Sequence, residues 1–255
     1  RCISNQYFDM TRLQAYKFRL EPTFDQQILL KKFAGCVRVV WNKGLALQQA
    51  LYADGQKKLG YAGLCKELTN WRNDPETPWL AEASVDIEQQ ILRDLETAYK
   101  RFFEKIADFP TFKKKGARDS FRFPQPKSIK LDQRNEKILL PKLGWLNYRK
   151  SRKVQGLVRN VTVSRKAGLW YVSIQTERKV AQVRHPAATA VGIDVGIVRF
   201  ATLWDGQVEQ VIAPLNSFKR HENRLAMAQQ KMSRKVKFSS NWKRAKLRVQ
   251  KIQNQ

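Results

Sequence analysis

Alternation between apolar and other side chains constrains the segment Ala190–Gly196 more tightly than any other part of the chain. Its apolar positions are Val191, Ile193 and Val195. On a β-strand these three side chains share one face, and Asp194 lies on the other face between Gly192 and Gly196. A carboxylate within a strand is unfavourable without a charged partner, and glycines leave room for a ligand to approach. The pattern predicts a metal-binding aspartate on a rigid strand. An ordinary turn before Gly196 is the alternative.

The charge of the chain indicates the kind of partner it binds. Its 255 residues include 49 Lys and Arg against 22 Asp and Glu, which gives a formal net charge of +27. A hydrophobic content of 42% and seven tryptophans predict a folded protein and exclude a disordered basic tail. The sequence contains no uninterrupted apolar segment of transmembrane length, so we expect no membrane partner. A nucleic acid is the polyanion that this composition favours.

The cysteines argue against a structural metal or disulfide framework. Cys2, Cys36 and Cys65 show no C-x-x-C spacing, and we therefore expect no zinc site. Cys36 and Cys65 lie on apolar faces of predicted helices, where they serve as small core residues. Free buried thiols fit a reducing, cytoplasmic location.

The first half of the chain is predicted to hold a strand and a helical module. Residues 1–9 form an upstream extension, and the alternating segment Ala15–Leu20 is a half-exposed strand within residues 10–24. Thr23 and Gln26 have capping-box spacing before an apolar stripe of helical period. Thr77-Pro78 is expected to open a further helical segment, whose apolar stripe runs from Ile87 to Ile106. Residues 25–108 therefore form a module of three main helices.

From residue 109 the sequence changes to short strands and turns. A hairpin is predicted around Lys166-Ala167-Gly168, with Val161 and Val163 directed inward. Together with the first strand, residues 109–188 make a small antiparallel barrel or sheet into which the helical module is inserted. A linker at 179–189 precedes the Asp194 strand and a hairpin turn at Asp205-Gly206. Residues 189–255 form the last region.

Two basic segments are candidates for nucleic-acid binding. The first combines cations and rings over a short stretch: Phe112, Lys113, Lys114, Lys115, Phe121, Arg122 and Phe123. Phosphate-binding cations beside stacking aromatics are typical of single-strand binding. The alternative is a solvated loop next to core aromatics.

The second basic segment carries twelve Lys and Arg residues between Lys219 and Lys251 against a single Glu222. Its apolar seam predicts two amphipathic helices with a hinge near Ser239-Ser240. So many cations repel one another unless a polyanion lies along them, although a solvated charged face is the ordinary alternative. The candidate contacts are Lys219, Arg220, Lys235, Lys243 and Arg244.

The order of several motifs resembles one known family. The matching stretches are Ala15–Thr23, Trp79-Leu80, Leu95–Phe103, Phe109–Lys115, Leu140–Gly144, Asn160–Val163 and Gly192–Gly196. Together they are similar to the OrfB-type transposon proteins, known as TnpB, which resemble the compact type V CRISPR nucleases in architecture. The resemblance covers the chain from about residue 11 to its last residue.

The resemblance implies an α+β multidomain fold. A small antiparallel wedge barrel with an inserted helical recognition module is followed by a partial RNase H-like (RuvC) α/β domain. It also implies an RNA-guided, magnesium-dependent DNA endonuclease whose partners are a transposon-derived guide RNA and double-stranded target DNA. Asp194 matches the first of three catalytic, metal-binding acids. Tyr61 and Gln89 match positions that contact a short motif adjacent to the target.

The family's second and third acids and its zinc-ribbon cysteines have no counterpart in this sequence. Because two-metal hydrolysis needs several converging carboxylates, we expect these 255 residues, as a C-terminally truncated piece, to bind nucleic acid without cutting it. A nuclease-incapable binding protein, such as a repressor or transposon relic, is the alternative function. A helix-turn-helix DNA binder built from residues 25–73 is a weaker alternative, because its turn is long for that motif. The oligomeric state is not predicted.

Overall fold

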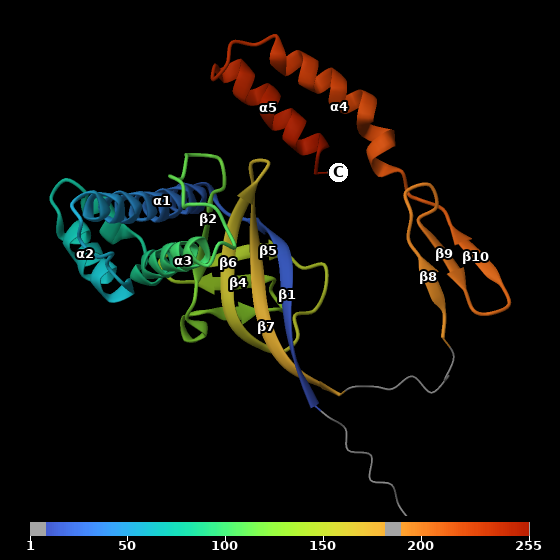
Figure 1. The fold of residues 1–255 in the computed structure, drawn as a ribbon, viewed down its shortest axis with the longest axis horizontal. Helices are drawn as coiled ribbons and strands as arrows, with labels where there is room; N and C mark the ends of the chain where they lie inside the picture. Colours follow the sequence, from blue (N-terminus) through green and yellow to red (C-terminus); the bar gives the residue numbers. More distant parts are fainter. Residues whose placement is uncertain (1–8, 182–189, 255) are drawn as a thin grey trace, which may run out of the picture. The chain divides into compact units, whose positions relative to one another are not determined.

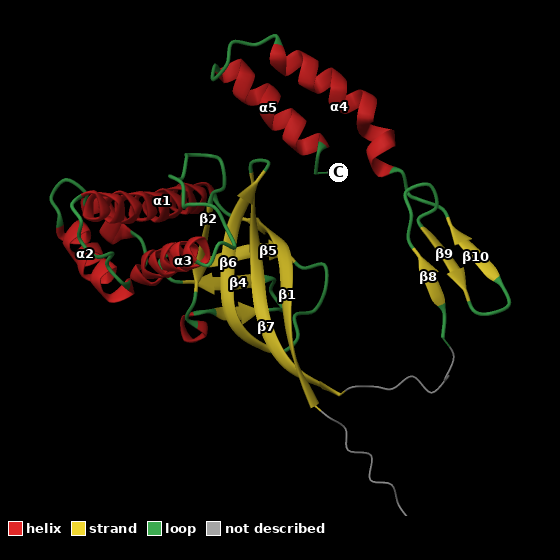
Figure 2. Ribbon diagram, in the orientation of Figure 1, coloured by secondary structure: helices red, strands yellow, loops and turns green. Residues whose placement is uncertain are grey.

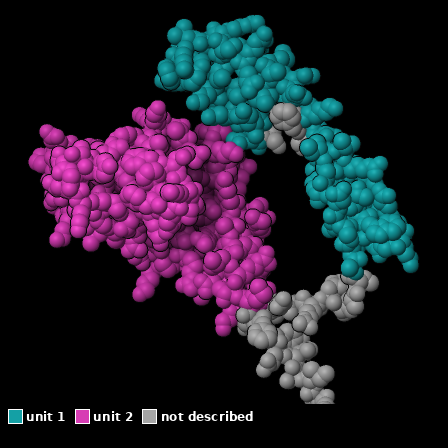
Figure 3. Space-filling model, viewed as in Figure 1, with its two compact units in different colours: residues 1–7, 181–255 teal, residues 8–180 magenta. Residues whose placement is uncertain are grey.

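The computed structural model describes residues 9–181 and 190–254, and the chain divides into two compact units. We call residues 8–180 the first unit (magenta, unit 2 in the key of Figure 3) and the part from residue 181 on the second unit (teal, unit 1 in that key). Two parts of the chain lie outside the described residues: residues 1–8 of the predicted upstream extension, which include Cys2, and residues 182–189 of the predicted linker, which include Thr189. Among the described helices, none is long and apolar enough to span a bilayer. Helices and strands both contribute, so the fold is a mixed α/β one (Figure 2).

The first unit contains a curled sheet of seven strands in the order β2-β6-β7-β1-β5-β4-β3 (Figure 1). The strands are β1 (Asp9–Glu21), β2 (Ser120–Phe123), β3 (Lys130–Asp132), β4 (Lys137–Leu140), β5 (Gly144–Arg149), β6 (Leu157–Lys166) and β7 (Leu169–Ala181). The antiparallel pairs include β1 with β5, β6 with β7, and β2 with β6. The sheet forms because alternating strands bury one face: Tyr16, Phe18 and Leu20 are buried, whereas Lys17 is exposed.

The predicted hairpin between β6 and β7 is confirmed. Lys166 pairs with Leu169, and the two residues between them, Ala167 and Gly168, both have positive φ, 49° and 81°. Two-residue turns of this kind match the right-handed twist of the strands they join. Val161 and Val163 are fully buried, as their alternation predicts.

Three helices cover residues 24–103: α1 (Phe24–Ala53), α2 (Tyr61–Asn73) and α3 (Val85–Phe103). The capping box is confirmed, since the Gln26 amide donates to Thr23 Oγ1 (3.4 Å) and the Thr23 amide donates to Gln26 Oε1 (3.1 Å). The expectation for Thr77-Pro78 was wrong in extent. Pro78–Glu82 is only a 3-10 helix, and α3 begins separately after Ser84. A proline starts a turn readily, but Ala83 and Ser84 are extended and break it from α3.

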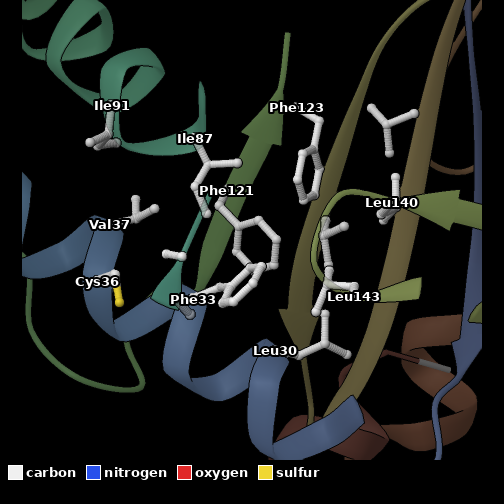
Figure 4. Close-up of a cluster of buried hydrophobic side chains, with 14 of the residues drawn as sticks. Leu30, Phe33, Cys36, Val37, Ile87, Ile91, Phe121, Phe123, Leu140 and Leu143 are labelled. Carbon is white, nitrogen blue, oxygen red and sulfur yellow. The ribbon is translucent and has the colours of Figure 1, made fainter. Parts of the chain in front are cut away.

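The helices and the sheet share one hydrophobic core (Figure 4). Phe33 of α1 meets Phe121 of β2 edge to face, with ring centroids 5.9 Å apart, and Ile87 of α3 is buried beside them. Each large apolar side chain buried in this way contributes about 1.5–3 kcal/mol. The helical module and the strands therefore pack as one unit and not as separate bodies.

The second unit contains a three-stranded antiparallel sheet in the order β10-β9-β8 and two helices. Its elements are β8 (Gly192–Asp194), β9 (Ala201–Trp204), β10 (Glu209–Ile212), α4 (Ser217–Ser233) and α5 (Ser240–Ile252). Val191 and Val195 lie outside β8, so the predicted strand is shorter than its alternation indicated. The two basic helices are confirmed. Ser239 caps α5 by accepting a hydrogen bond from the Trp242 amide (3.1 Å), and Ala228, Val249 and Ile252 form the seam between α4 and α5.

Candidate nucleic-acid interface

Asp194 lies at the end of β8, directly opposite Thr202 of β9, which in turn pairs with Val211 of β10. Residues paired across antiparallel strands share a face, so these three side chains form one row. Asp194 and its neighbours in β8 are exposed. The carboxylate of Asp194 is thus accessible to solvent, and its role as a metal ligand stays a prediction.

The described residues do not form a metal site around Asp194. Among the described residues, no group of three or more His, Cys, Asp and Glu side chains could hold a metal ion. Asp205 accepts hydrogen bonds from the amides of Gln207 (2.9 Å) and Val208 (2.8 Å) and so caps its own hairpin turn. Glu209 lies two strands away, about 10 Å across the sheet, and pairs with Arg199 at 3.4 Å. The residues described here do not fit a two-metal site.

Tyr61 and Gln89 belong to one surface of the helical module. Tyr61 begins α2, and its amide donates to Glu96 Oε1 of α3 at 3.2 Å. The guanidinium of Arg93 lies 4.5 Å from the centre of the Tyr61 ring. Gln89 precedes Arg93 by one turn of α3, so the two side chains share a helix face.

Arg93 is a residue that sequence reasoning missed. Burial raises the pKa of the Tyr61 hydroxyl, and Arg93 itself is exposed beside it. The i,i+4 spacing from Gln89 was the signal that could have identified it. The structure thus brings Arg93 to the Tyr61 ring, on the helix face that also carries Gln89.

The three lysines that follow Phe112 differ from one another. Lys114 and Lys115 are exposed, whereas Lys113 is half-buried over the indole of Trp41, with Nζ 4.2 Å from the ring centre. Burial lowers the pKa of Lys113. Asn42 holds the backbone of Lys113 with two hydrogen bonds: the Lys113 amide donates to Asn42 Oδ1 (2.8 Å), and Asn42 Nδ2 donates to the Lys113 carbonyl (3.1 Å). This loop is therefore anchored and not a free solvated one.

The expectation that Phe121 and Phe123 are stacking platforms was wrong. Their exposed fractions are 3% and 1%, because β2 directs both rings into the shared core (Figure 4). Phe112 remains accessible, with 48% of its surface exposed. Arg122, between the two buried rings, points outward and pairs with Asp94 of α3 at 2.7 Å.

Arg122 and Lys113 both line a cavity of about 390 Å³ between α1, α3 and β2. Asp94 of α3 and Trp41 of α1 also line this cavity, so its lining combines charges of both signs with an aromatic ring. Because Arg122 is already paired with Asp94, it attracts a phosphate less strongly than an unpaired arginine would.

The cations of the second unit are open to solvent. All five candidate residues there are exposed, and none of them forms an ion pair among the described residues: Lys219, Arg220, Lys235, Lys243 and Arg244. Lys246 lies over the Trp242 ring at 5.2 Å. A hairpin of two helices with so little acidic compensation is an electrostatic surface for a polyanion.

Comparison with protein families gives two matches. A model described as "Helix-turn-helix domain" of OrfB proteins of the IS605 type matches residues 10–57, and one described as "Probable transposase" of the same type matches residues 171–255. The structure of residues 10–57 consists of most of β1, all of α1 and the start of the α1–α2 connection. Seven residues, 54–60, separate the end of α1 at Ala53 from the start of α2 at Tyr61. This connection is longer than the turn of about 3–4 residues in a helix-turn-helix motif.

Two curated relatives match nearly the whole chain. One, "Putative RNA-guided DNA endonuclease InsQ" of Escherichia coli (strain K12), is 48% identical over 243 residues, which is 95% of this chain and 59% of the relative. Another, "Putative RNA-guided DNA endonuclease" of Streptomyces pristinaespiralis, is 36% identical over 245 residues, 94% of this chain and 59% of the relative. The chain thus spans less than two thirds of each.

Chains in two solved structures also match. A chain in the cryo-EM structure of a Cas12f1–sgRNA–target DNA complex is 9% identical, with a TM-score of 0.47, over 96% of this chain and 75% of that chain. A chain in a CRISPR–Cas12f ternary complex is 11% identical, with a TM-score of 0.39, over 85% of this chain and 55% of that one.

Proposed function

The chain belongs to the OrfB family of transposon proteins, also called TnpB, and on this premise we propose that it contributes nucleic-acid recognition to an RNA-guided DNA endonuclease. The observation that carries the proposal is the identity with InsQ of Escherichia coli, which extends over 95% of this chain. The charge of +27 and the exposed cations of α4 and α5 support binding of RNA and DNA. The guide is an RNA encoded by the transposon, and the target is double-stranded DNA.

We assign the domains as the resemblance implies. Residues 10–24 and 109–188 form the wedge barrel, 25–108 the recognition module, and 189–255 a RuvC-like part with the basic helices. Tyr61 and Gln89 contact the motif next to the target, with Arg93 supporting the Tyr61 ring. The remaining candidates bind backbone phosphates: Lys113, Lys114, Lys115, Arg122, Lys219, Arg220, Lys235, Lys243 and Arg244.

Asp194 is the proposed catalytic acid and magnesium ligand. Magnesium supplies the activated water and the charge that stabilises a transferring phosphate, but a pair of ions needs several carboxylates. We therefore expect cleavage only from a polypeptide that brings further acids to Asp194. A nuclease-incapable repressor or relic is the second candidate, because no metal-binding group occurs among the described residues.

Binding and cleavage assays with RNA transcribed from the transposon end test the proposal. The wild-type chain should bind this RNA, and in any polypeptide that cuts DNA, Asp194→Ala should abolish magnesium-dependent cutting without weakening RNA binding. Asp205→Asn is the matched control, because an amide oxygen preserves the acceptor that caps the turn. Absence of RNA binding, or full cutting by the Asp194 variant, contradicts the proposed role.

A further inference from the structure

A groove of about 670 Å³ runs along α1 in the first unit. Its walls come from four parts of the fold: α1 itself, Trp79 of the 3-10 helix, residues 115–116, and Arg165 of β6. Trp79 and Ile28 leave 37% and 39% of their surfaces exposed there. The volume falls within the range of about 300–1,000 Å³ that is typical of ligand sites. We call this concavity the α1 groove.

The rim of the α1 groove is strongly basic. Five cations and a single carboxylate line it: Lys31, Lys32, Arg38, Lys115, Arg165 and Asp119. Two of the cations are already paired, Arg38 with Asp119 at 3.1 Å and Lys32 with Glu82 at 2.7 Å.

The other three cations of the rim have no carboxylate partner among the described residues: Lys31, Lys115 and Arg165. The buried Nε of Arg165 also has no hydrogen-bond acceptor there. An anion with several oxygens in the groove would pair with Lys31 and Lys115, which are both exposed, and with the guanidinium of Arg165.

Gly35, in the interior of α1, has no structural reason to be glycine. A Cβ at Gly35 would meet only Arg38 Nη2, at 3.7 Å, which is ordinary contact. The other glycine of α1, Gly44, is explained by packing, since a Cβ there would lie 3.0 Å from Leu95 and 3.2 Å from Leu92. A glycine in a helix interior costs about 1 kcal/mol relative to alanine. Because Gly35 has no side chain, the helix backbone is exposed on the groove wall, where a flat ligand can approach it closely.

We infer that the α1 groove binds an unpaired nucleotide of a single-stranded nucleic acid, with the base on Trp79 beside Gly35. Phosphates on either side of this base meet Lys31, Lys115 and Arg165. In a duplex the faces of the bases are stacked on one another and cannot contact a protein ring. An exposed ring beside an apolar wall therefore favours an unpaired base. The inference rests on the proposed nucleic-acid binding, to which it adds a specific site that the motifs in the sequence did not indicate.

Affinity for a fluorescent oligouridylate of about ten nucleotides, a length within the usual site sizes of about 4–16, tests the inference. Gly35→Leu should fill the groove and weaken binding at least about tenfold, the loss expected for one stacked base. Leucine favours helix more than glycine does, so the variant should melt no earlier than wild type. Gly35→Ala adds a single methyl group at the same position and should weaken binding less than Gly35→Leu does.

A second pair of variants separates stacking from general loss of aromatic surface. Trp79→Ala should weaken binding about tenfold, whereas Trp145→Ala, which removes an indole with 45% exposure outside the groove, should not. An oligouridylate that carries 5-iodouridine should crosslink to Trp79 under ultraviolet light. Single-stranded RNA, single-stranded DNA and duplex DNA of one sequence are compared in competition, and both single strands should compete better than the duplex.

The inference fails if Gly35→Leu and Trp79→Ala bind the oligonucleotide as wild type does, or if duplex DNA competes as well as the single strands. It also fails if transposon-end RNA binds normally but the oligonucleotide does not, and that result leaves the proposed function intact. No binding of any RNA or DNA contradicts the proposed function itself.

Discussion

The ammonium group of Lys113 lies 4.2 Å from the centre of the Trp41 indole, which separates this lysine from its two neighbours in the sequence. Trp41 is itself fixed, because its Nε1 donates to the Thr111 carbonyl at 3.0 Å. The contact therefore joins α1 to the strand-rich half of the first unit. In this position Lys113 stabilises the fold, in addition to any contact that it makes with a ligand.

Lys113→Ala is expected to lower the free energy of unfolding by about 1 kcal/mol, the usual size of a partly buried cation–π contact. Lys114→Ala/Lys115→Ala should leave stability unchanged, since both side chains are exposed, and should weaken RNA binding. Urea denaturation and RNA titration of both variants measure these effects. If the two variants are equally stable, the contact of Lys113 with Trp41 does not stabilise the fold. If the double variant binds RNA with unchanged affinity, Lys114 and Lys115 are not part of the interface.

RNA binding should depend strongly on salt, because the chain carries a formal charge of +27. If six to ten phosphates are neutralised, affinity should fall by about 10³–10⁵ between 50 and 200 mM salt. Titration of transposon-end RNA at several salt concentrations gives the slope. An affinity that stays flat over this range contradicts a polyanion interface.

The basic helices should contribute to that slope without contributing to stability. Lys243 and Arg244 are exposed on α5, away from the buried seam residues Val249 and Ile252. Replacing both cations by alanine should reduce the salt slope by about 1 for each cation and weaken RNA binding. Replacing Gln229 of α4, which is exposed and uncharged, is the control. A slope identical to that of wild type would identify these cations as solvated surface.

Glu88 should make the stability of the first unit depend on pH. It is fully buried, Arg72 donates a hydrogen bond to its Oε2, and burial raises its pKa from 4.5 to about 7. The folded state therefore binds the proton of Glu88 more tightly than the unfolded state does. The resulting stabilisation of the fold is complete below pH 4.5 and is lost as the pH rises through about 7.

Urea denaturation across this range should show the free energy of unfolding falling with pH, and Glu88→Gln should flatten that fall. Glu76→Gln, at an exposed position, should leave the wild-type profile unchanged. Identical profiles for wild type and Glu88→Gln would show that another group dominates.

Local interactions explain which elements could be predicted from the sequence. The capping box of Thr23 and Gln26 and the turn at Ala167-Gly168 depend on residues that are close along the chain. The alternation in β1 depends only on the geometry of a strand with one buried face. The short strand that carries Asp194 was also predicted from a local pattern, but its apolar face is not buried, since Ile193 is 64% exposed.

The tertiary structure decided what each ring and cation faces. Phe121 and Phe123 could have been stacking surfaces, but α1 and α3 cover that face of β2 and bury them. Asn42 and Lys113 are 71 residues apart, and the α1 groove joins residues of α1 to Arg165 of β6. Burial and charge pairing depend on contacts between distant segments, which periodicity along the chain does not specify. Composition therefore indicates that a polyanion is the partner of this protein, and packing determines which of its cations are exposed to meet one.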